Sequence, residues 1–196
     1  FVVSSVHAQQ RRVDQAGHPL RVAVHQVGRQ RHDPRQRLTP LVAHVQRHRA
    51  ALAEPNQHHP RPRHPPRFLA RQQRLTFARM GMTDPRSLAD YQAYGGFDGL
   101  RNAIAMPPEA IVQTLIDSGL RGRGGAAFPA GIKWKTVAGA QAAQKYIVCN
   151  ADEGDSGTFS DRMTMEGDPF MLIEGMAIAA LAVGATQGYV YVRSEY

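Results

Sequence analysis

The sequence predicts an α/β fold with a parallel pair of strands, because three C-terminal segments follow one another in a telling order. Lys145–Cys149 has the short apolar pattern of a buried strand. A helix should begin at Asp168-Pro169 and end at Gly184, since proline suits the first turn and glycine the residue after the last. Gly188–Arg193 then alternates as a strand. A strand, a helix and a strand in this order form a βαβ crossover with parallel strands covered by helices.

Three further helices are predicted before this unit. Apolar residues within 68–80 are compatible with a first helix. A second begins after the turn at Thr83–Pro85, carries Tyr91 and ends at Gly95-Gly96. A third begins at Pro107-Pro108 and ends at Gly119. The apolar residues of this third helix, expected to face the core, are Ile111, Val112, Leu115 and Ile116.

The 196 residues divide into two parts of opposite charge. Residues 1–79 contain 15 arginines, no lysine and 3 acidic residues, whereas residues 80–196 contain 9 basic and 13 acidic residues. All 9 histidines lie between His7 and His64. We therefore assign residues 1–66 to a disordered or wrong-frame segment rich in Arg, His and Pro, and residues 67–196 to the folded domain.

Three interpretations of residues 1–66 differ in their consequences. The segment could be a disordered tail. It could also be the product of translating a GC-rich gene in the wrong frame, which gives this composition. The third interpretation is a basic arm that binds the phosphates of nucleic acid. The absence of lysine, the near absence of aromatic residues for base stacking and the lack of a recognisable motif argue against the arm. Nucleic acid is therefore not expected as a partner, and salt-sensitive binding that is lost on deletion of this segment would reverse that expectation.

Cysteine content and hydropathy limit the classes of protein further. Cys149 is the single cysteine, which excludes an internal disulfide or an all-cysteine metal site within this chain, and it is expected to be a small buried residue. No metal site is predicted. The most apolar run, Phe170–Val183, is shorter than a membrane span and contains Glu174. Without a signal peptide pattern, a cytoplasmic location is expected.

A glycine-rich segment, Gly119–Trp134, reads GLRGRGGAAFPAGIKW. Glycines let the backbone approach a ligand, and closely spaced N–H groups with Arg121, Arg123 and Lys133 favour a phosphate. Phe128 adds an aromatic ring. The segment is therefore predicted to bind a phosphate-bearing ligand with a flat ring, although a glycine-rich turn that only reverses the chain is the structural alternative.

Residues 122–127 also satisfy the dinucleotide pattern G-x-G-x-x-A, but the context is wrong. A Rossmann loop follows a strand, whereas this loop follows a predicted helix, and no acidic residue stands about twenty positions further on. The phosphate-binding P-loop pattern fails as well, because Gly131-Ile132-Lys133 lacks the required glycine spacing and the following Ser or Thr.

A second motif, Asn150–Arg162, reads NADEGDSGTFSDR and leaves the carboxyl end of the first predicted strand. Ligands of open α/β sheets bind at this edge. The acceptors that could bind a polyol, a ring imide or a nicotinamide are Asp152, Glu153 and Asp155. A solvated acidic turn closed by Asn150 is the structural alternative. Asp161-Arg162 is interpreted as a structural ion pair or helix cap.

These two motifs, followed by GDPFMLIEGM and GYVYVRSEY, closely resemble the FMN- and NADH-binding 51 kDa flavoprotein subunit of complex I and its relatives. The relatives include the diaphorase subunit of NAD-reducing hydrogenases and the beta subunit of soluble NAD-dependent formate dehydrogenases. The resemblance covers residues 68–196. Ala127 and Asp155-Ser156 make it most similar to the formate dehydrogenase branch.

The resemblance implies a role for each residue of the two motifs. The residues around the FMN phosphate and ribityl chain would be Gly122, Arg123, Gly124, Gly125 and Lys133. The flavin would accept or donate hydrogen bonds with Asn150, Asp152 and Glu153. Phe128 would stack on the nicotinamide or adenine of NAD(H), and Asp155 stands where the family usually has a glutamate that contacts the dinucleotide. No catalytic acid or base is expected.

The implied function is a subunit that passes electrons between NAD(H), FMN and iron–sulfur clusters. The expected assembly is a formate dehydrogenase; a complex I or hydrogenase assembly is the alternative within this class. Family members continue beyond this point to a bundle whose cysteines bind a [4Fe–4S] cluster, and those ligands are absent here. The sequence is therefore interpreted as a fragment that binds FMN weakly or not at all by itself.

Overall fold

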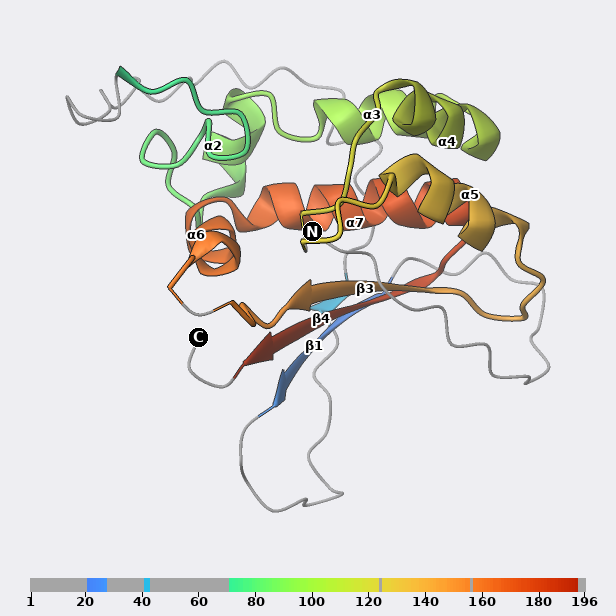
Figure 1. Cartoon of the computed structure of the whole chain (residues 1–196). Helices are drawn as coiled ribbons and strands as arrows, with labels where there is room; N and C mark the ends of the chain where they lie inside the picture. Colours follow the sequence, from blue (N-terminus) through green and yellow to red (C-terminus); the bar gives the residue numbers. More distant parts are fainter. Residues whose placement is uncertain (1–20, 28–40, 43–70, 124, 156, 194–196) are drawn as a thin grey trace.

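The computed structural model describes residues 21–27, 41–42, 71–123, 125–155 and 157–193. A four-stranded sheet with the order β2-β1-β4-β3 forms one layer (Figure 1). Its strands are β1 (Arg21–Val27), β2 (Leu41–Val42), β3 (Tyr146–Ala151) and β4 (Gln187–Arg193). Strand β4 pairs in parallel with both β1 and β3, whereas β2 pairs with β1 in the antiparallel direction.

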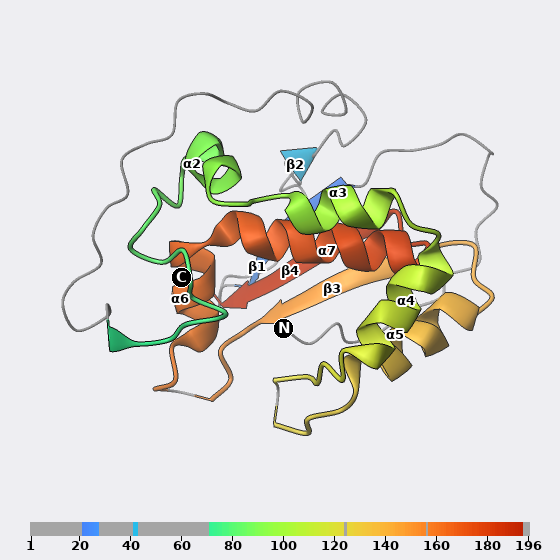
Figure 2. The ribbon, with the colours of Figure 1, turned by 90° about the horizontal axis from the view of Figure 1, so that it is seen from above.

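Six described helices lie on one side of this sheet (Figure 1). They are α2 (Leu88–Ala93), α3 (Asp98–Ile104), α4 (Pro108–Asp117), α5 (Ala130–Gly139), α6 (Ser160–Gly167) and α7 (Pro169–Val183). Helix α7 lies against β3 and β4, and α3 and α4 cover α7 from outside (Figures 1 and 2). No helix in the described ranges is long and apolar enough to cross a membrane.

The predicted βαβ crossover is confirmed, and with it the α/β class. Tyr146 of β3 lies opposite Gln187 of β4, and the parallel register continues to Ala151 opposite Val192. Helix α7 makes the connection and ends where expected, at Gly184 with a φ of 73°. A left-handed residue at this position lets the chain leave the helix and return to the sheet.

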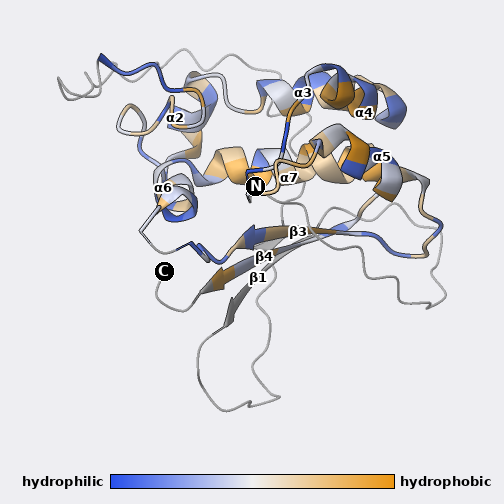
Figure 3. Ribbon diagram, in the orientation of Figure 1, coloured by the Kyte–Doolittle hydropathy of each residue, from blue (hydrophilic) through white to orange (hydrophobic). Residues whose placement is uncertain are grey.

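Small side chains let α7 pack closely on the sheet. Ala179 is 1% exposed and Ile147 of β3 is also 1% exposed. Cys149 belongs to the same core, as predicted, and burial raises the pKa of its thiol to about 11. In Figure 3 part of β3 and part of β4 have the colour of hydrophobic residues, and hydrophilic residues follow where β3 ends. The polar segment that begins at Asp152 therefore follows directly on the buried residues of β3.

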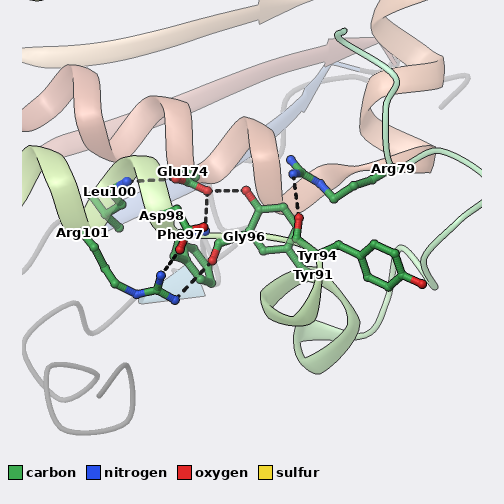
Figure 4. A network of polar contacts seen from close by, with 9 residues as sticks. All are labelled: Arg79, Tyr91, Tyr94, Gly96, Phe97, Asp98, Leu100, Arg101 and Glu174. Carbon is green, nitrogen blue, oxygen red and sulfur yellow. Dashed lines mark hydrogen bonds and ion pairs between the residues drawn. The ribbon is translucent and has the colours of Figure 1, made fainter. Parts of the chain in front are cut away.

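A buried carboxylate fastens α2 and α3 to α7 (Figure 4). Glu174 accepts hydrogen bonds from the hydroxyl of Tyr91 and from the backbone N–H groups of Phe97, at 2.8 Å, and Leu100, at 2.9 Å. The two amides belong to the first turn of α3, so Glu174 caps that helix from a distance. Burial first, and then the hydrogen bond to Glu174, raise the pKa of Tyr91 well above its usual range.

The helices over 83–95 and 107–119 are confirmed as α2 and α4, but the helix over 68–80 is wrong. The described residues 71–82 form turns, and Leu75 is 87% exposed. The side chain of Arg74 donates to the carbonyl of Met80, and no apolar face reaches the core at Leu75. A helix of this length needs such burial to be stable.

Three helices, α3, α5 and α6, were not predicted. Phe97 and Phe159, the residues before α3 and α6, have left-handed backbones with φ values of 65° and 53° and give no side-chain cap. Pro129 before α5 gives none either. The local signals of a helix start are therefore missing.

Strands β1 and β2 lie in residues 1–66, where no element was predicted. Most of that segment, which includes the nucleic-acid arm considered above, lies outside the described residues.

Substituting Gly131 should separate α4 from α5. A Cβ there would lie 2.7 Å from the backbone nitrogen and 2.8 Å from the Cα of Ile116. Gly131→Ala should therefore lower the free energy of unfolding by about 1–3 kcal/mol. Gly139→Ala in the same helix meets nothing within 4 Å, so this control should be neutral or slightly stabilising. Denaturant unfolding of both variants tests this, and equal stability would contradict the close packing.

Removing one donor from the buried carboxylate should be costly as well. Tyr91→Phe should lower the free energy of unfolding by about 1–3 kcal/mol, because Glu174 stays buried with one partner fewer. The control is Tyr94→Phe, whose hydroxyl bonds to no described residue. Thermal unfolding compares the two, and an equal effect would show that the Tyr91 hydroxyl adds nothing to the network.

Candidate functional site

The glycine-rich segment forms a closed loop between α4 and α5. Arg121 and Pro129 form an antiparallel bridge at its base. The N–H of Gly122 donates to the carbonyl of Phe128 at 2.9 Å, and the N–H of Ala130 donates to the carbonyl of Leu120 at 2.8 Å. The loop is thus held at both ends, and its described residues 123 and 125–128 are exposed.

Two residues of the loop have a left-handed backbone. Gly125 has a φ of 93° and Ala127 a φ of 49°, both in the left-handed region that glycine favours. At Gly122 a Cβ would meet the carbonyl oxygen of Phe128 only at 3.6 Å, so this position tolerates a side chain. Gly124 lies outside the described residues.

Donor groups remain available on this loop. Within the described residues, no hydrogen bond engages the backbone N–H groups of Arg123, Gly125 or Ala126. Backbone amides in such a turn, beside the start of α5, form a concave arrangement that suits an anion. The loop can therefore accept a phosphate without losing bonds of its own.

The three predicted cations differ in their roles. Arg121 donates from Nη1 to the carbonyl of Ala127 at 3.0 Å, so it braces the loop. Arg123 is exposed and Lys133 is half-buried on the first turn of α5. Neither is joined to a described acidic residue by an ion pair. Arg123 and Lys133 are therefore the two cations that could meet an anionic ligand.

The aromatic residues of the segment also separate. Phe128 is 50% exposed at the end of the loop, where a flat ring could stack on it. Trp134 packs against the hydrophobic core instead. The structure therefore gives a structural role to Trp134 and leaves the Phe128 ring accessible.

Asn150 and Asp152 form a turn where β3 ends. The N–H of Asp152 donates to Oδ1 of Asn150 at 3.1 Å, which is the Asx turn given as the structural alternative for this segment. Asn150 is exposed, Asp152 is half-buried and Asp155 is exposed. The Asn150 side-chain amide nitrogen and the Asp152 carboxylate still face no described donor or acceptor.

Glu153 differs from its neighbours because it is buried. It is 4% exposed and has a φ of 56°. Its Oε2 accepts from the N–H of Arg162 at 2.7 Å, and its Oε1 accepts from the hydroxyl of Thr158 at 2.6 Å. Burial alone would raise the pKa of Glu153, but Thr158 and the N–H groups of Arg162, Ser160 and Asp161 together lower it.

Thr158 and the first turn of α6 are the site residues that sequence reasoning missed. An acidic residue shortly before a helix start is a usual sign of a cap. Glu153 stands seven positions before Ser160, the first residue of α6, which is too far for that sign to be recognised. Its side chain reaches the helix start because the chain folds back. The Asp161-Arg162 interpretation is half right. The ion pair of Arg162 is with Glu166, whose Oε1 lies 2.9 Å from Nε, and not with Asp161. A cap is present as well: the N–H of Arg162, in the first turn of α6, donates to the carboxylate of Glu153, and this contact is called the α6 cap below.

The two motifs lie at the same end of the sheet. In two views turned by 90°, the loop between α4 and α5 lies beside the carboxyl end of β3, and the segment after β3 continues beyond that end (Figures 1 and 2). The glycine-rich loop and the acidic segment are therefore neighbours at one end of the sheet. In the described part of the chain, no group of three His, Cys, Asp or Glu side chains could hold a metal ion.

Comparison with known families supports this pairing of motifs. Residues 115–196 match the Nuo51 FMN-binding domain. The predicted resemblance to the flavoprotein subunit of complex I and its relatives is confirmed over this segment. The match includes both the loop after α4 and the acidic segment after β3.

Individual relatives cover more of the chain but little of their own length. The chain is 51% identical over 126 residues to the NADP-reducing hydrogenase subunit HndC of Solidesulfovibrio fructosivorans, which is 64% of this chain and 26% of that protein. It is 52% identical over 114 residues to an NADH-quinone oxidoreductase subunit of Rhizobium meliloti (strain 1021), covering 58% and 27% of the two chains. The chain thus spans about a quarter of the length of these relatives.

The similar solved structures include the NAD⁺-reducing [NiFe]-hydrogenase in the H2-reduced state. Its sequence identity is 43%, its TM-score is 0.45, and the match covers 48% of this chain and 17% of that one.

The cap on α6 predicts a pH dependence of stability. Because folding lowers the pKa of Glu153 below 4.5, the stabilisation is complete at neutral pH and is lost as the pH falls through the folded value. Glu153→Gln should therefore melt at a lower temperature than the parent chain at pH 7, and the difference should shrink below pH 4.5.

The control for this measurement is Glu166→Gln, on the same helix. Glu166 is 62% exposed in its pair with Arg162, and such surface pairs contribute little. Melting curves from pH 3 to pH 8 compare the three proteins. A Glu153→Gln difference that stays constant across this range would show that the charge of Glu153 is not what stabilises α6.

Proposed function

We propose that this chain carries the FMN-binding part of a flavoprotein subunit that passes electrons between NAD(H), FMN and iron–sulfur clusters. The observation that supports this most is the position of the glycine loop beside the acidic segment, at the carboxyl end of β3, within the matched FMN-binding segment. The residues present fit FMN in their chemistry, because the glycine loop and the start of α5 offer unengaged backbone amides, two cations and an exposed aromatic ring, and the neighbouring segment after β3 offers polar side chains.

Each part of the cofactor has a complementary group in this arrangement. The phosphate and ribityl chain would meet Arg123, Lys133 and the backbone at Gly122, Gly124 and Gly125. Asn150 and Asp152 would hydrogen-bond the flavin ring. Of the three flavin-ring residues suggested by the resemblance, Glu153 has its carboxylate inside the α6 cap. Phe128 and Asp155, both exposed, would contact the dinucleotide.

Bound FMN supplies hydride exchange with NAD(H) and single-electron exchange with iron–sulfur clusters. The side chains of this chain need only bind and orient the two ring systems. Lys133 and Arg123 offset the phosphate charge, and Phe128 presents a face for stacking. None of these residues has to give up or take a proton during the reaction.

We further propose that the parent assembly is an NAD-dependent formate dehydrogenase located in the cytoplasm, with this chain in its beta subunit. Ala127 and Asp155-Ser156 in the two motifs support this branch. The relatives named above are hydrogenase and NADH-quinone oxidoreductase subunits, so these assemblies are the alternatives. The [4Fe–4S] cluster would be held elsewhere, because this chain has a single cysteine.

The loop assignment can be tested at Gly122, where a methyl group fits the chain. A Cβ there meets no atom closer than 3.6 Å, so Gly122→Ala should melt like the parent chain. The same methyl group should weaken FMN binding, because the cofactor approaches the backbone at this residue. Of the two outcomes expected from the sequence, weak binding and no binding, the proposal requires weak binding, because the loop amides and cations are present in this chain. Titration with FMN, followed by amide chemical shifts in NMR spectra, measures it.

Two outcomes of this titration would contradict the proposal. FMN-induced shifts outside residues 120–134 and 150–156 would place the ligand elsewhere. Equal FMN affinity of Gly122→Ala and the control Gly139→Ala would show that the loop backbone does not approach the cofactor. A stoichiometric, tightly bound FMN in the chain as purified would contradict the expectation of weak binding.

The choice of branch has its own test in the intact parent assembly. Reduction of NAD⁺ by formate is expected, and oxidation of NADH by quinone is not. The opposite pair of results would assign the assembly to the complex I type, while leaving the FMN site unchanged.

A further inference from the structure

We propose that Glu153 is a positioning residue of the cofactor site, which holds the loop between β3 and α6 so that Asp152 and Asp155 are presented to the ligands. The inference rests on the proposed function, since it concerns how the same site is held in place. It changes the role of Glu153 from a contact of the flavin to a support for the residues on either side.

Both carboxylate oxygens of Glu153 are already engaged inside the protein. Oε1 accepts from the Thr158 hydroxyl and Oε2 accepts from the N–H of Arg162, and the N–H groups of Ser160 and Asp161 also favour the charged carboxylate. A bond from Glu153 to the flavin would therefore break the cap on α6, leaving buried amides without a partner.

The backbone at Glu153 fits this role. Its φ of 56° is unusual for a residue other than glycine. This conformation turns the side chain of Glu153 into the protein, where it is 4% exposed, while Asp155 two residues on is exposed. A strained residue kept in place by several hydrogen bonds is typical of a functional loop whose shape must be fixed.

Thr158 extends the support to Asp155. The Thr158 hydroxyl lies 2.6 Å from Glu153 Oε1, and the Thr158 N–H donates to the carbonyl of Asp155 at 3.4 Å. The backbone that carries Asp155 is therefore tied to Glu153 through one side chain. Loss of the hydroxyl should loosen Asp155 by removing one hydrogen bond to Glu153, while the Glu153 carboxylate and its charge stay in place.

Helix α6 is a firm anchor for this loop because its other end is fixed too. Asp168, the residue after α6, donates its N–H to the carbonyl of Thr164 at 2.9 Å. Its carboxylate pairs with Nε of Arg79 at 2.8 Å, and both side chains are largely buried. The loop is thus attached to the first turn of α6, while the ion pair with Arg79 holds the residue that follows the last turn of α6.

The test uses the 196-residue chain and four variants: Glu153→Gln, Thr158→Val, Thr158→Ser and the surface control Glu166→Gln. Each is examined for amide hydrogen exchange in residues 152–162 and for FMN affinity by NMR titration. Glu153→Gln should speed exchange in this segment and weaken FMN binding about tenfold, which corresponds to the loss of one or two charge-assisted hydrogen bonds.

Thr158 separates positioning from general damage to the fold. Thr158→Val should change both quantities in the same direction as Glu153→Gln, and Thr158→Ser should restore them because the hydroxyl returns. The Thr158 pair also keeps the test decisive if Glu153→Gln fails to fold. The control Glu166→Gln should change neither quantity.

The outcomes distinguish this inference from the proposed function. Weaker FMN binding by Glu153→Gln with unchanged exchange would mean that Glu153 contacts the flavin directly, which overturns positioning alone. Faster exchange with unchanged FMN affinity, or equal affinity of the Thr158 pair, also overturns it alone. No FMN-induced shifts in the parent chain at millimolar FMN would overturn the proposed function, and this inference with it.

Discussion

The close packing of α7 between the sheet and the outer helices is the constraint on which the rest of the structure depends. Alanine residues let the helix approach β3 and β4, where Ile147 and Ala179 are almost fully buried. The same helix carries Glu174, whose carboxylate reaches the opposite way and holds α2 and α3. Helix α7 thus determines both the spacing between the sheet and the helical layer and the position of the outer helices.

Two buried carboxylates solve the same physical problem at different places. Glu174 accepts amides from the first turn of α3, and Glu153 accepts amides from the first turn of α6. In both cases the residue before the helix has a left-handed backbone and gives no side-chain cap. A charge buried against a helix start is stable because the amides there carry partial positive charge and lack other partners.

The candidate site follows from this scaffold. The bridge between Arg121 and Pro129 closes the glycine loop, and the contact of Gly131 with Ile116 sets α5, which continues from it, against α4. The cap by Glu153 fixes the acidic loop at the end of β3. The glycine loop carries unengaged backbone amides, an exposed ring and, with the first turn of α5, two cations without an ion pair to a described residue, and the acidic loop carries short polar side chains. Rigid supports on both sides leave these groups little freedom to lose when a ligand binds.

By itself the sequence determined the α/β class, the crossover from β3 to β4, both ends of α7 and the two motifs, because proline, glycine and apolar periodicity act locally. It also indicated which residues could meet a phosphate. Only the tertiary structure decided that α3 and α6 form, since their caps are Glu174 and Glu153, carboxylates outside the helices they cap. It likewise decided that Arg121 braces the loop, that Trp134 joins the core, and that Glu153 turns inward while Asp155 stays exposed. Hydrogen bonds between residues separated in the chain determine these outcomes, and no local pattern encodes them.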